Sequence, residues 1–375
     1  MRREITVRHF FRPDEWRRGG MDGEAQAVRP GGQRRSTLAD CIGNAAPVAR
    51  LRRMLAAGAI VACSLAPMPA LAFDAGEVVV SIKPLHSLVA AVMDGVGMPA
   101  LIVKGGGSPH SYSLRPSEAR ALDGAKVVFL VSPETLETFL AGPLAALASG
   151  AEVVELGEAD GVMHLAPRES DSFEAHDHAG EAEGMAKGAA TAAGDDHEGH
   201  AHGAVDPHLW LDPANGRAMV PAIVVALSRA DPDHAALYAA NGDKLAARIA
   251  DATVRIEAKI APVRGRPFIV FHDAYQYFEK RFGLAAAGAV TLNPQAQPGA
   301  RGIAHIRERI AETGAVCVFS EPQFEPRIVT VVTEGTGARS GMLDPIGADL
   351  ADGPELYFKL LERNADALVG CLSGR

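Results

Sequence analysis

Three histidines stand in contexts where a side chain can do chemistry: His110, His208 and His272. His272 directly follows the apolar run PFIVF, and His110 follows the apolar run ALIV after a glycine-rich stretch. Both runs are expected to be strands, and open α/β sheets bind ligands at the carboxyl ends of their strands. His208 lies in VDPHLWLDP, where a polar segment gives way to apolar sequence. Three imidazoles with one carboxylate or water form a shell that suits Zn²⁺, so the pattern predicts a transition-metal site.

Two acidic residues complete the predicted site. Asp344, in GMLDPIGADL, follows another short apolar run and is the candidate fourth ligand, with water as the alternative. Glu321, in SEPQF, also ends an apolar run. We expect its carboxylate to orient a ligand histidine by accepting a hydrogen bond, and an ordinary salt bridge is the alternative. Imidazole donors favour a transition ion over Mg²⁺ or Ca²⁺, which prefer oxygen ligands.

A segment rich in glycine, alanine, histidine and acidic residues extends from about residue 164 to residue 204. It has no hydrophobic period, which predicts a loop that does not pack. We interpret its histidines as an accessory set that collects metal weakly, and a solvated linker is the alternative. These histidines are His176, His178, His197, His200 and His202.

Apolar runs and helical segments alternate on both sides of this loop, which is typical of βαβ units with mainly parallel sheets. We therefore expect an α/β fold of two lobes with the metal in the cleft between them. The N-terminal lobe is predicted over residues 73–230 and the C-terminal lobe over residues 266–375. The linking segment, 231–265, is predicted to hold a long helix from about residue 234 to 261. One face of this helix is expected to carry the apolar residues Leu245, Ile249, Ile256 and Ile260.

Residues 1–72 are interpreted as a leader, made of an upstream extension and a secretory signal peptide. A basic start precedes the apolar run MLAAGAIVACSLAPMP, and Ala70-Leu71-Ala72 has the form of a signal-peptidase site. We therefore expect Sec-type export, cleavage after Ala72 and a periplasmic location. A lipid anchor on Cys63 is the alternative.

The charge balance bears on partners. The leader carries 12 arginines and six acidic residues, so the rest of the chain has a net charge of about −15. An acidic surface argues against nucleic acid as a partner and is compatible with cations. We expect a monomer.

Two cysteines, Cys317 and Cys371, lie outside the leader. In an exported chain they predict one disulfide, with two separate buried thiols as the alternative.

Seven blocks of the sequence resemble the zinc-binding, ZnuA-type periplasmic proteins of ABC transporters, within a wider cluster of metal-binding solute-binding proteins. They cover essentially all of residues 78–375. In chain order they are SIKPLHSLVAAVMDGVG, HSYSLRPSEARAL, HLWLDP, FHDAYQYFEKRFGL, NPQAQPGAR, CVFSEPQF and LDPIGADL. The resemblance implies two lobes bridged by a long helix, with Zn²⁺ held between them by His110, His208 and His272.

The resemblance also implies a disulfide between Cys317 and Cys371, and a function without catalysis. A protein of this family captures Zn²⁺ and delivers it to a membrane permease that works with an ATPase. The sequence departs from part of the family at Pro109, where some zinc-specific members carry a glutamate ligand. This leaves Asp344 or water as the fourth ligand.

Two other classes of function stay open at this point. One is a manganese or iron carrier of the same cluster, or a metal-dependent adhesin. Three histidines argue against manganese, because its carriers generally replace one of them with a carboxylate. The other is an exported zinc hydrolase, which needs an open metal position and a general base. The sequence contains no HExxH motif.

Overall fold

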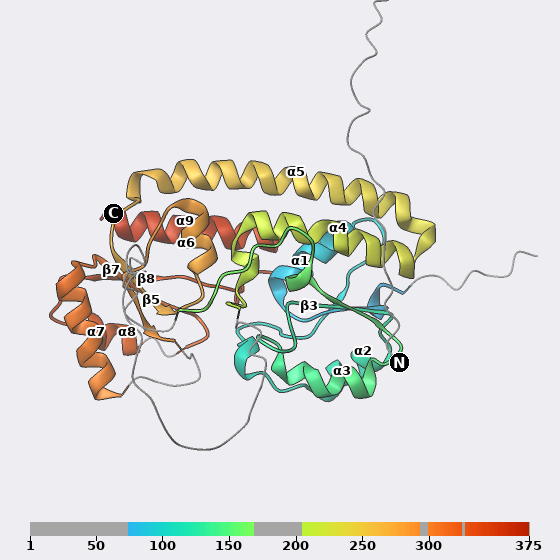
Figure 1. The fold of residues 1–375 in the computed structure, drawn as a ribbon, viewed down its shortest axis with the longest axis horizontal. Helices are drawn as coiled ribbons and strands as arrows, with labels where there is room; N and C mark the ends of the chain where they lie inside the picture. The colour runs from blue at the N-terminus through green and yellow to red at the C-terminus, as the bar shows by residue number, and fades with distance from the viewer. Residues whose placement is uncertain (1–73, 169–204, 293–298, 325–326, 375) are drawn as a thin grey trace, which may run out of the picture. The chain divides into compact units, whose positions relative to one another are not determined.

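The computed structural model describes residues 74–168, 205–292, 299–324 and 327–374, all within one compact unit, Pro67–Arg375 (Figure 1). The predicted leader, its cleavage after Ala72 and the alternative anchor at Cys63 lie outside the described residues. Within the described ranges, no helix combines the length and the apolar character needed to cross a membrane.

The N-terminal lobe contains a sheet of four parallel strands. Its order is β2 (Ala100–Leu101), β1 (Val78–Val80), β3 (Val127–Leu130) and β4 (Glu152–Glu155). The central strands β1 and β3 consist entirely of buried apolar residues, as expected for a parallel sheet covered by helices on both faces. Helix α1 (Lys83–Val92) lies on one side of the sheet, and α2 (Pro116–Asp123) and α3 (Ala141–Leu147) lie on the other (Figure 1).

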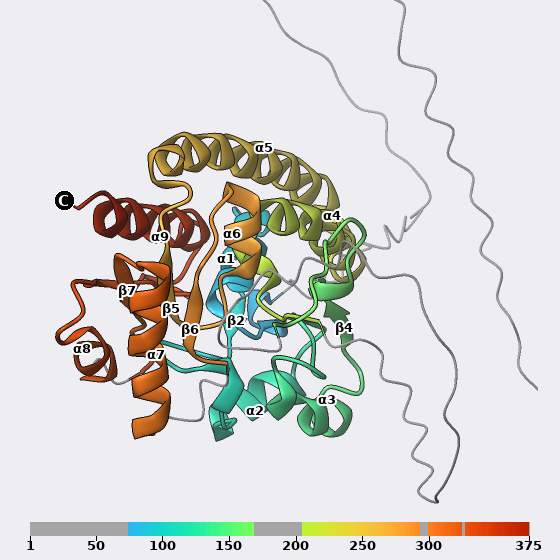
Figure 2. The same ribbon diagram turned by 60° about the vertical axis from the view of Figure 1, so that its left-hand side comes forward.

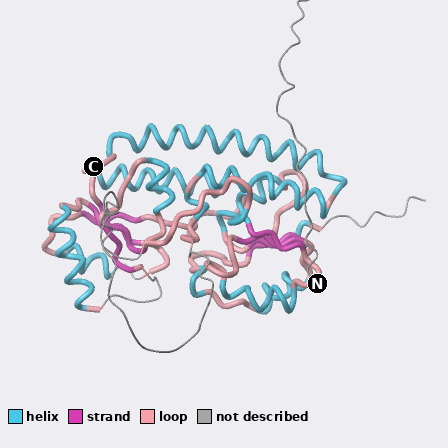
Figure 3. The backbone as a smooth tube through the Cα atoms, in the orientation of Figure 1, coloured by secondary structure: helices cyan, strands magenta, loops and turns pink. Residues whose placement is uncertain are grey.

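The C-terminal lobe repeats this arrangement with a second sheet of four parallel strands. Its order is β6 (Gly288–Thr291), β5 (Phe268–His272), β7 (Cys317–Ser320) and β8 (Arg339–Met342). Its helices include α6 (Gln276–Phe282), α7 (Ala300–Thr313) and α8 (Arg327–Thr333). Figure 3 shows the strands in two separate groups, one in each lobe. Two α/β lobes with parallel sheets confirm the predicted fold class.

Two helices connect the lobes, α4 (Pro213–Ala230) and α5 (Ala235–Ile260). The side chain of Asp212 starts α4 by accepting a hydrogen bond from the Ala214 amide, and Pro213 occupies the first turn. At 26 residues, α5 is about 39 Å long. The predicted long helix is therefore confirmed, and its buried face includes the four residues expected there, Leu245, Ile249, Ile256 and Ile260.

The last helix, α9 (Leu356–Ser373), serves both lobes, although its sequence lies within the predicted C-terminal lobe. It packs against α5 and α1, and Figures 1 and 2 show it on the same side of the molecule as α4 and α5. The Tyr357 hydroxyl donates to the Trp210 carbonyl oxygen at 2.7 Å, and Trp210 Nε1 donates to the Pro345 carbonyl oxygen at 2.7 Å. Through such contacts one continuous hydrophobic core joins the two lobes.

A disulfide fixes the other end of α9. It links Cys317, at the start of β7, to Cys371, which lies 54 residues further along the chain near the end of α9. The predicted disulfide is confirmed. In the chain-entropy account, a crosslink of this span stabilises the folded state by about 4 kcal/mol. Helix α9 is thus tied to the C-terminal sheet at one end and to Trp210 at the other.

Substitution of Gly216 tests how tightly the lobes are joined. A Cβ added to Gly216, in α4, would overlap with the Tyr357 hydroxyl, and Tyr357 is fully buried. We expect Gly216→Ala to lower the free energy of unfolding by about 1–3 kcal/mol, as overpacking does. Gly142→Ala is the matched control, because it lies in α3 with open space around it. Urea unfolding of both variants checks this, and equal stability of the two would contradict the expectation.

Candidate metal centre

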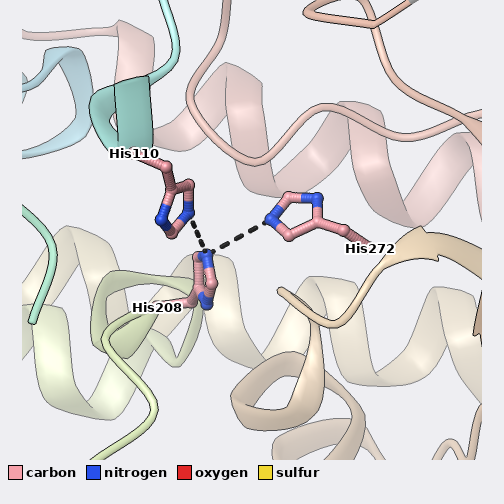
Figure 4. Close-up of side chains that lie close together, drawn as sticks. All are labelled: His110, His208 and His272. Atoms are coloured by element: carbon pink, nitrogen blue, oxygen red, sulfur yellow. Dashed lines mark hydrogen bonds between the residues drawn. The ribbon is translucent and has the colours of Figure 1, made fainter. Parts of the chain in front are cut away.

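His110, His208 and His272 converge on one point through their Nε2 atoms (Figure 4). His208 Nε2 lies 3.2 Å from His110 Nε2 and 3.3 Å from His272 Nε2. One ligand atom from each of the three histidines lies within 4.8 Å of the others. Among the described residues these three make up the one such group of possible metal ligands. The structure therefore brings together the three histidines that the sequence singled out.

Each histidine is positioned by a different element. His272 is the last residue of β5, and His110 lies in a short 3₁₀ turn, Pro109–Ser111, beyond the end of β2. His208 immediately precedes a second 3₁₀ turn, Leu209–Leu211, which leads into α4. The cluster therefore lies where the carboxyl ends of strands from both sheets meet, as expected for ligand sites in open α/β sheets.

The spacing of the three rings fits a tetrahedral metal ion. Zn–N bonds of about 2.0–2.1 Å in a tetrahedron place neighbouring nitrogens roughly 3.3–3.4 Å apart. The two Nε2 separations at His208, 3.2 and 3.3 Å, are close to this value. Small adjustments of the rings would complete three corners of the shell, which leaves one corner for another ligand.

Two buried carboxylates fix the tautomers of His208 and His272. Asp206 Oδ1 lies 2.8 Å from His208 Nδ1, and Glu321 Oε1 lies 2.8 Å from His272 Nδ1. A carboxylate accepts the Nδ1 proton, so the lone pair of each ring is on Nε2, the atom that faces the cluster. Glu321 lies where the sequence placed it, beside a ligand-type histidine.

Asp206 is not among the site residues predicted from the sequence. It stands two residues before His208 in the motif DPH, and its Oδ1 also accepts a hydrogen bond from the His208 amide at 3.0 Å. That short spacing was the available signal. Burial raises the pKa of Asp206 to about 7, while the His208 amide and Arg168 act in the opposite direction. A cation at the cluster would favour the charged carboxylate.

Burial also disfavours the protonated forms of His110 and His208. Loss of solvation, with repulsion from His208 and His272, lowers the pKa of His110 to about 2. Desolvation likewise lowers the pKa of His208 well below its usual value, and His272 adds to this. A free histidine takes up its proton near pH 6.5, at about which point it stops binding metal. His110 and His208 stay available as ligands at lower pH, because protons compete poorly for them.

The structure does not bring Asp344 to this cluster. Its Oδ1 accepts hydrogen bonds from the amides of Ile346 (3.1 Å) and Gly347 (2.9 Å), and its Oδ2 accepts one from the Ala348 amide (2.6 Å). Gln323 Nε2 donates to Oδ1 as well, at 2.9 Å. The carboxylate therefore holds the turn that follows β8. Of the two expected fourth ligands, water is the one that this geometry leaves free to bind.

The five accessory histidines, His176, His178, His197, His200 and His202, lie outside the described residues. Arg168 is the last described residue before their segment, and it pairs with Asp273 at 2.7 Å and Glu279 at 2.8 Å. It lines a pocket together with all three clustered histidines, Asp206 and Asp273. The first residues of the predicted loop, up to Arg168, are thus held against the C-terminal lobe beside the cluster.

Two parallel-sheet lobes, with three ligand-type histidines gathered at the carboxyl ends of strands from both, define a two-lobed binding protein with a metal-type site. A family model described as "Zinc-uptake complex component A periplasmic" matches residues 78–371. The chain belongs to this zinc-uptake family. Over 312 residues it is 50% identical to the high-affinity zinc uptake system protein ZnuA of Brucella suis. The aligned region covers 80% of this chain and 93% of that protein.

Solved structures share the fold. A crystal structure of a ZnuA has a TM-score of 0.63 at 22% identity and covers 78% of this chain and 98% of that chain. The binding protein FpvC from Pseudomonas aeruginosa, solved in complex with Mn²⁺, has a TM-score of 0.62 at 21% identity, with 79% and 98% covered.

Removal of the Asp206 carboxylate tests its effect on His208. Loss of a carboxylate that orients a metal-ligating histidine typically lowers metal affinity by about 10- to 100-fold. We expect Asp206→Ala to weaken Zn²⁺ binding by that factor in a competition titration. Asp231→Ala is the matched control, since Asp231 makes the same kind of contact, 2.7 Å to His234 Nδ1, outside the cluster. An unchanged affinity in Asp206→Ala would contradict this role.

Proposed function

We propose that this protein is the zinc-binding component of an ABC-type uptake system. It captures Zn²⁺ at His110, His208 and His272 in the periplasm and delivers the ion to a membrane permease, whose partner ATPase drives import. The observation that carries the proposal is the convergence of three histidine Nε2 atoms, two pairs of which lie close to tetrahedral spacing. Relatives that share half of their residues with this chain are named as high-affinity zinc uptake proteins, which supports the same cargo.

The donor set favours Zn²⁺ over Mn²⁺. Manganese prefers carboxylate, carbonyl and water oxygens, whereas imidazole suits zinc and other borderline ions. The carboxylates nearest the histidines are engaged elsewhere, Asp206 and Glu321 with ring nitrogens and Asp344 with backbone amides. The described part of the cluster therefore presents three nitrogen donors and no carboxylate to an ion.

The same contacts favour a carrier over a zinc hydrolase. A hydrolase needs a base that can take a proton from a metal-bound water. Asp206 and Glu321 instead hold ligand rings, and Asp344 holds a turn, so these carboxylates build the site. We infer that the protein binds metal without turnover.

We further propose that residues 1–72 direct export and that cleavage after Ala72 releases the protein into the periplasm. The family description names that compartment. The five accessory histidines, from His176 to His202, act as a set that collects metal weakly. Arg168, which precedes them in the chain, lines a pocket together with the main cluster.

Zinc titration of the chain from residue 73 onward tests this function. We expect one tight site in the wild type, and loss of that site in His272→Ala, because two imidazoles cannot complete the shell. His234→Ala is the matched control, since His234 is a histidine paired with a carboxylate outside the cluster. Deletion of residues 170–204 should keep the tight site and lower the total zinc bound. A tight site that survives in His272→Ala, or that is lost on deletion of the segment, would refute the assignment.

A further inference from the structure

Gln323 occupies an unusual position beside the metal centre. It follows β7 by three residues and lines a narrow pocket together with His110, His208 and His272. Its Nε2 donates a hydrogen bond to Asp344 Oδ1 at 2.9 Å. Its Oε1 is buried, and the described residues offer it no hydrogen-bond donor. A buried carbonyl oxygen without a donor is rare in native proteins and calls for an explanation such as a bound water.

The orientation of this amide follows from chemistry. A carboxylate has no proton to give, so the side of Gln323 that faces Asp344 must be its NH₂ group. The oxygen is then forced to the other side, and a flip of the amide would place two acceptors against each other. Asp344 thus determines which atom of Gln323 is left for a further partner.

Asp344 itself depends on this contact. Three backbone amides, those of Ile346, Gly347 and Ala348, bind its two carboxylate oxygens, and Gln323 is the one side chain among the described residues that donates to this carboxylate. Asp344 directly precedes Pro345, which lines the same pocket as the histidines. Ile346, whose amide binds the Asp344 carboxylate, lines this pocket as well, so that carboxylate lies in the turn that forms the pocket wall.

We propose that Gln323 determines the metal selectivity of this site. Through Nε2 it keeps the Asp344 carboxylate with its turn, and through Oε1 it accepts a hydrogen bond from a water molecule that is the fourth ligand of the bound ion. The inference rests on the proposed zinc-carrier function and assigns a residue to its selectivity. Gln323 is a positioning residue, since it acts on the ion through Asp344 and the water.

The physical basis is the difference between the two possible fourth ligands. A metal-bound water is a strong hydrogen-bond donor, because the ion withdraws electron density from it. A buried amide oxygen suits such a donor and adds no charge. A carboxylate in the same place would add a negative oxygen donor, which favours Mn²⁺ relative to a shell of three imidazoles and water.

Gln323→Met tests this proposal, because methionine is similar in size and has neither donor nor comparable acceptor. We expect the ratio of Mn²⁺ to Zn²⁺ affinity, measured by competition titration, to rise about tenfold, which corresponds to the contribution of one hydrogen bond to a charged group. Co²⁺ absorption gives a second readout. The visible bands of the bound ion should change in the variant as a carboxylate oxygen takes the place of water, and they should weaken if both carboxylate oxygens bind and raise the coordination number.

A second substitution identifies the cause. In Gln323→Met with Asp344→Asn, the side chain released from residue 323 carries no charge, so both the selectivity and the Co²⁺ spectrum should return toward those of the wild type. Circular dichroism checks that each variant folds, and Gln323→Leu serves if the methionine variant does not, since leucine also lacks a donor and an acceptor. Unchanged selectivity and spectrum in folded Gln323 variants would overturn the proposal. Failure of the wild type to bind Zn²⁺ would instead refute the carrier function itself.

Discussion

The site depends on three imidazoles held with their Nε2 atoms facing one another. His208 Nε2 lies 3.2 Å from His110 Nε2 and 3.3 Å from His272 Nε2, and so close an approach of three rings needs support from other parts of the chain. Asp206 and Glu321 supply that support, because each fixes a ring through Nδ1 and leaves Nε2 unprotonated. Burial lowers the pKa of His110 and of His208, so protons compete poorly for these two rings. A cation is the partner that satisfies all three rings at once.

The rest of the fold keeps these donors at a fixed separation. His272 belongs to the C-terminal sheet, whereas His110 belongs to the N-terminal lobe and His208 to the approach to α4. Relative movement of the lobes would therefore pull the cluster apart. Helices α5 and α9, the disulfide at Cys371 and the chain of contacts from Tyr357 through Trp210 to Pro345 resist such movement. The pairing of Arg168 with Asp273 and Glu279 adds a further link close to the metal centre.

Much of this organisation can be predicted from the sequence, because the ends of apolar runs in a βαβ pattern mark one edge of each sheet. That argument finds His110, His272 and Glu321. It misplaces Asp344, which also ends an apolar run, because the sequence does not show that its carboxylate is needed by the amides of the following turn. It misses Asp206, because a carboxylate two residues from a histidine resembles any other loop residue. It also assigns α9 to one lobe, since helix sharing depends on packing across the whole chain.

A bound ion should be held by three imidazole nitrogens from this chain and by water at the fourth corner. X-ray absorption spectroscopy at the zinc edge, on the protein loaded with one equivalent and lacking residues 170–204, measures that shell without interference from the accessory histidines. We predict a four-coordinate site with three imidazoles at about 2.0–2.1 Å and one further oxygen. Fewer than three imidazoles, or a shell of five or six ligands with a carboxylate, would contradict the account.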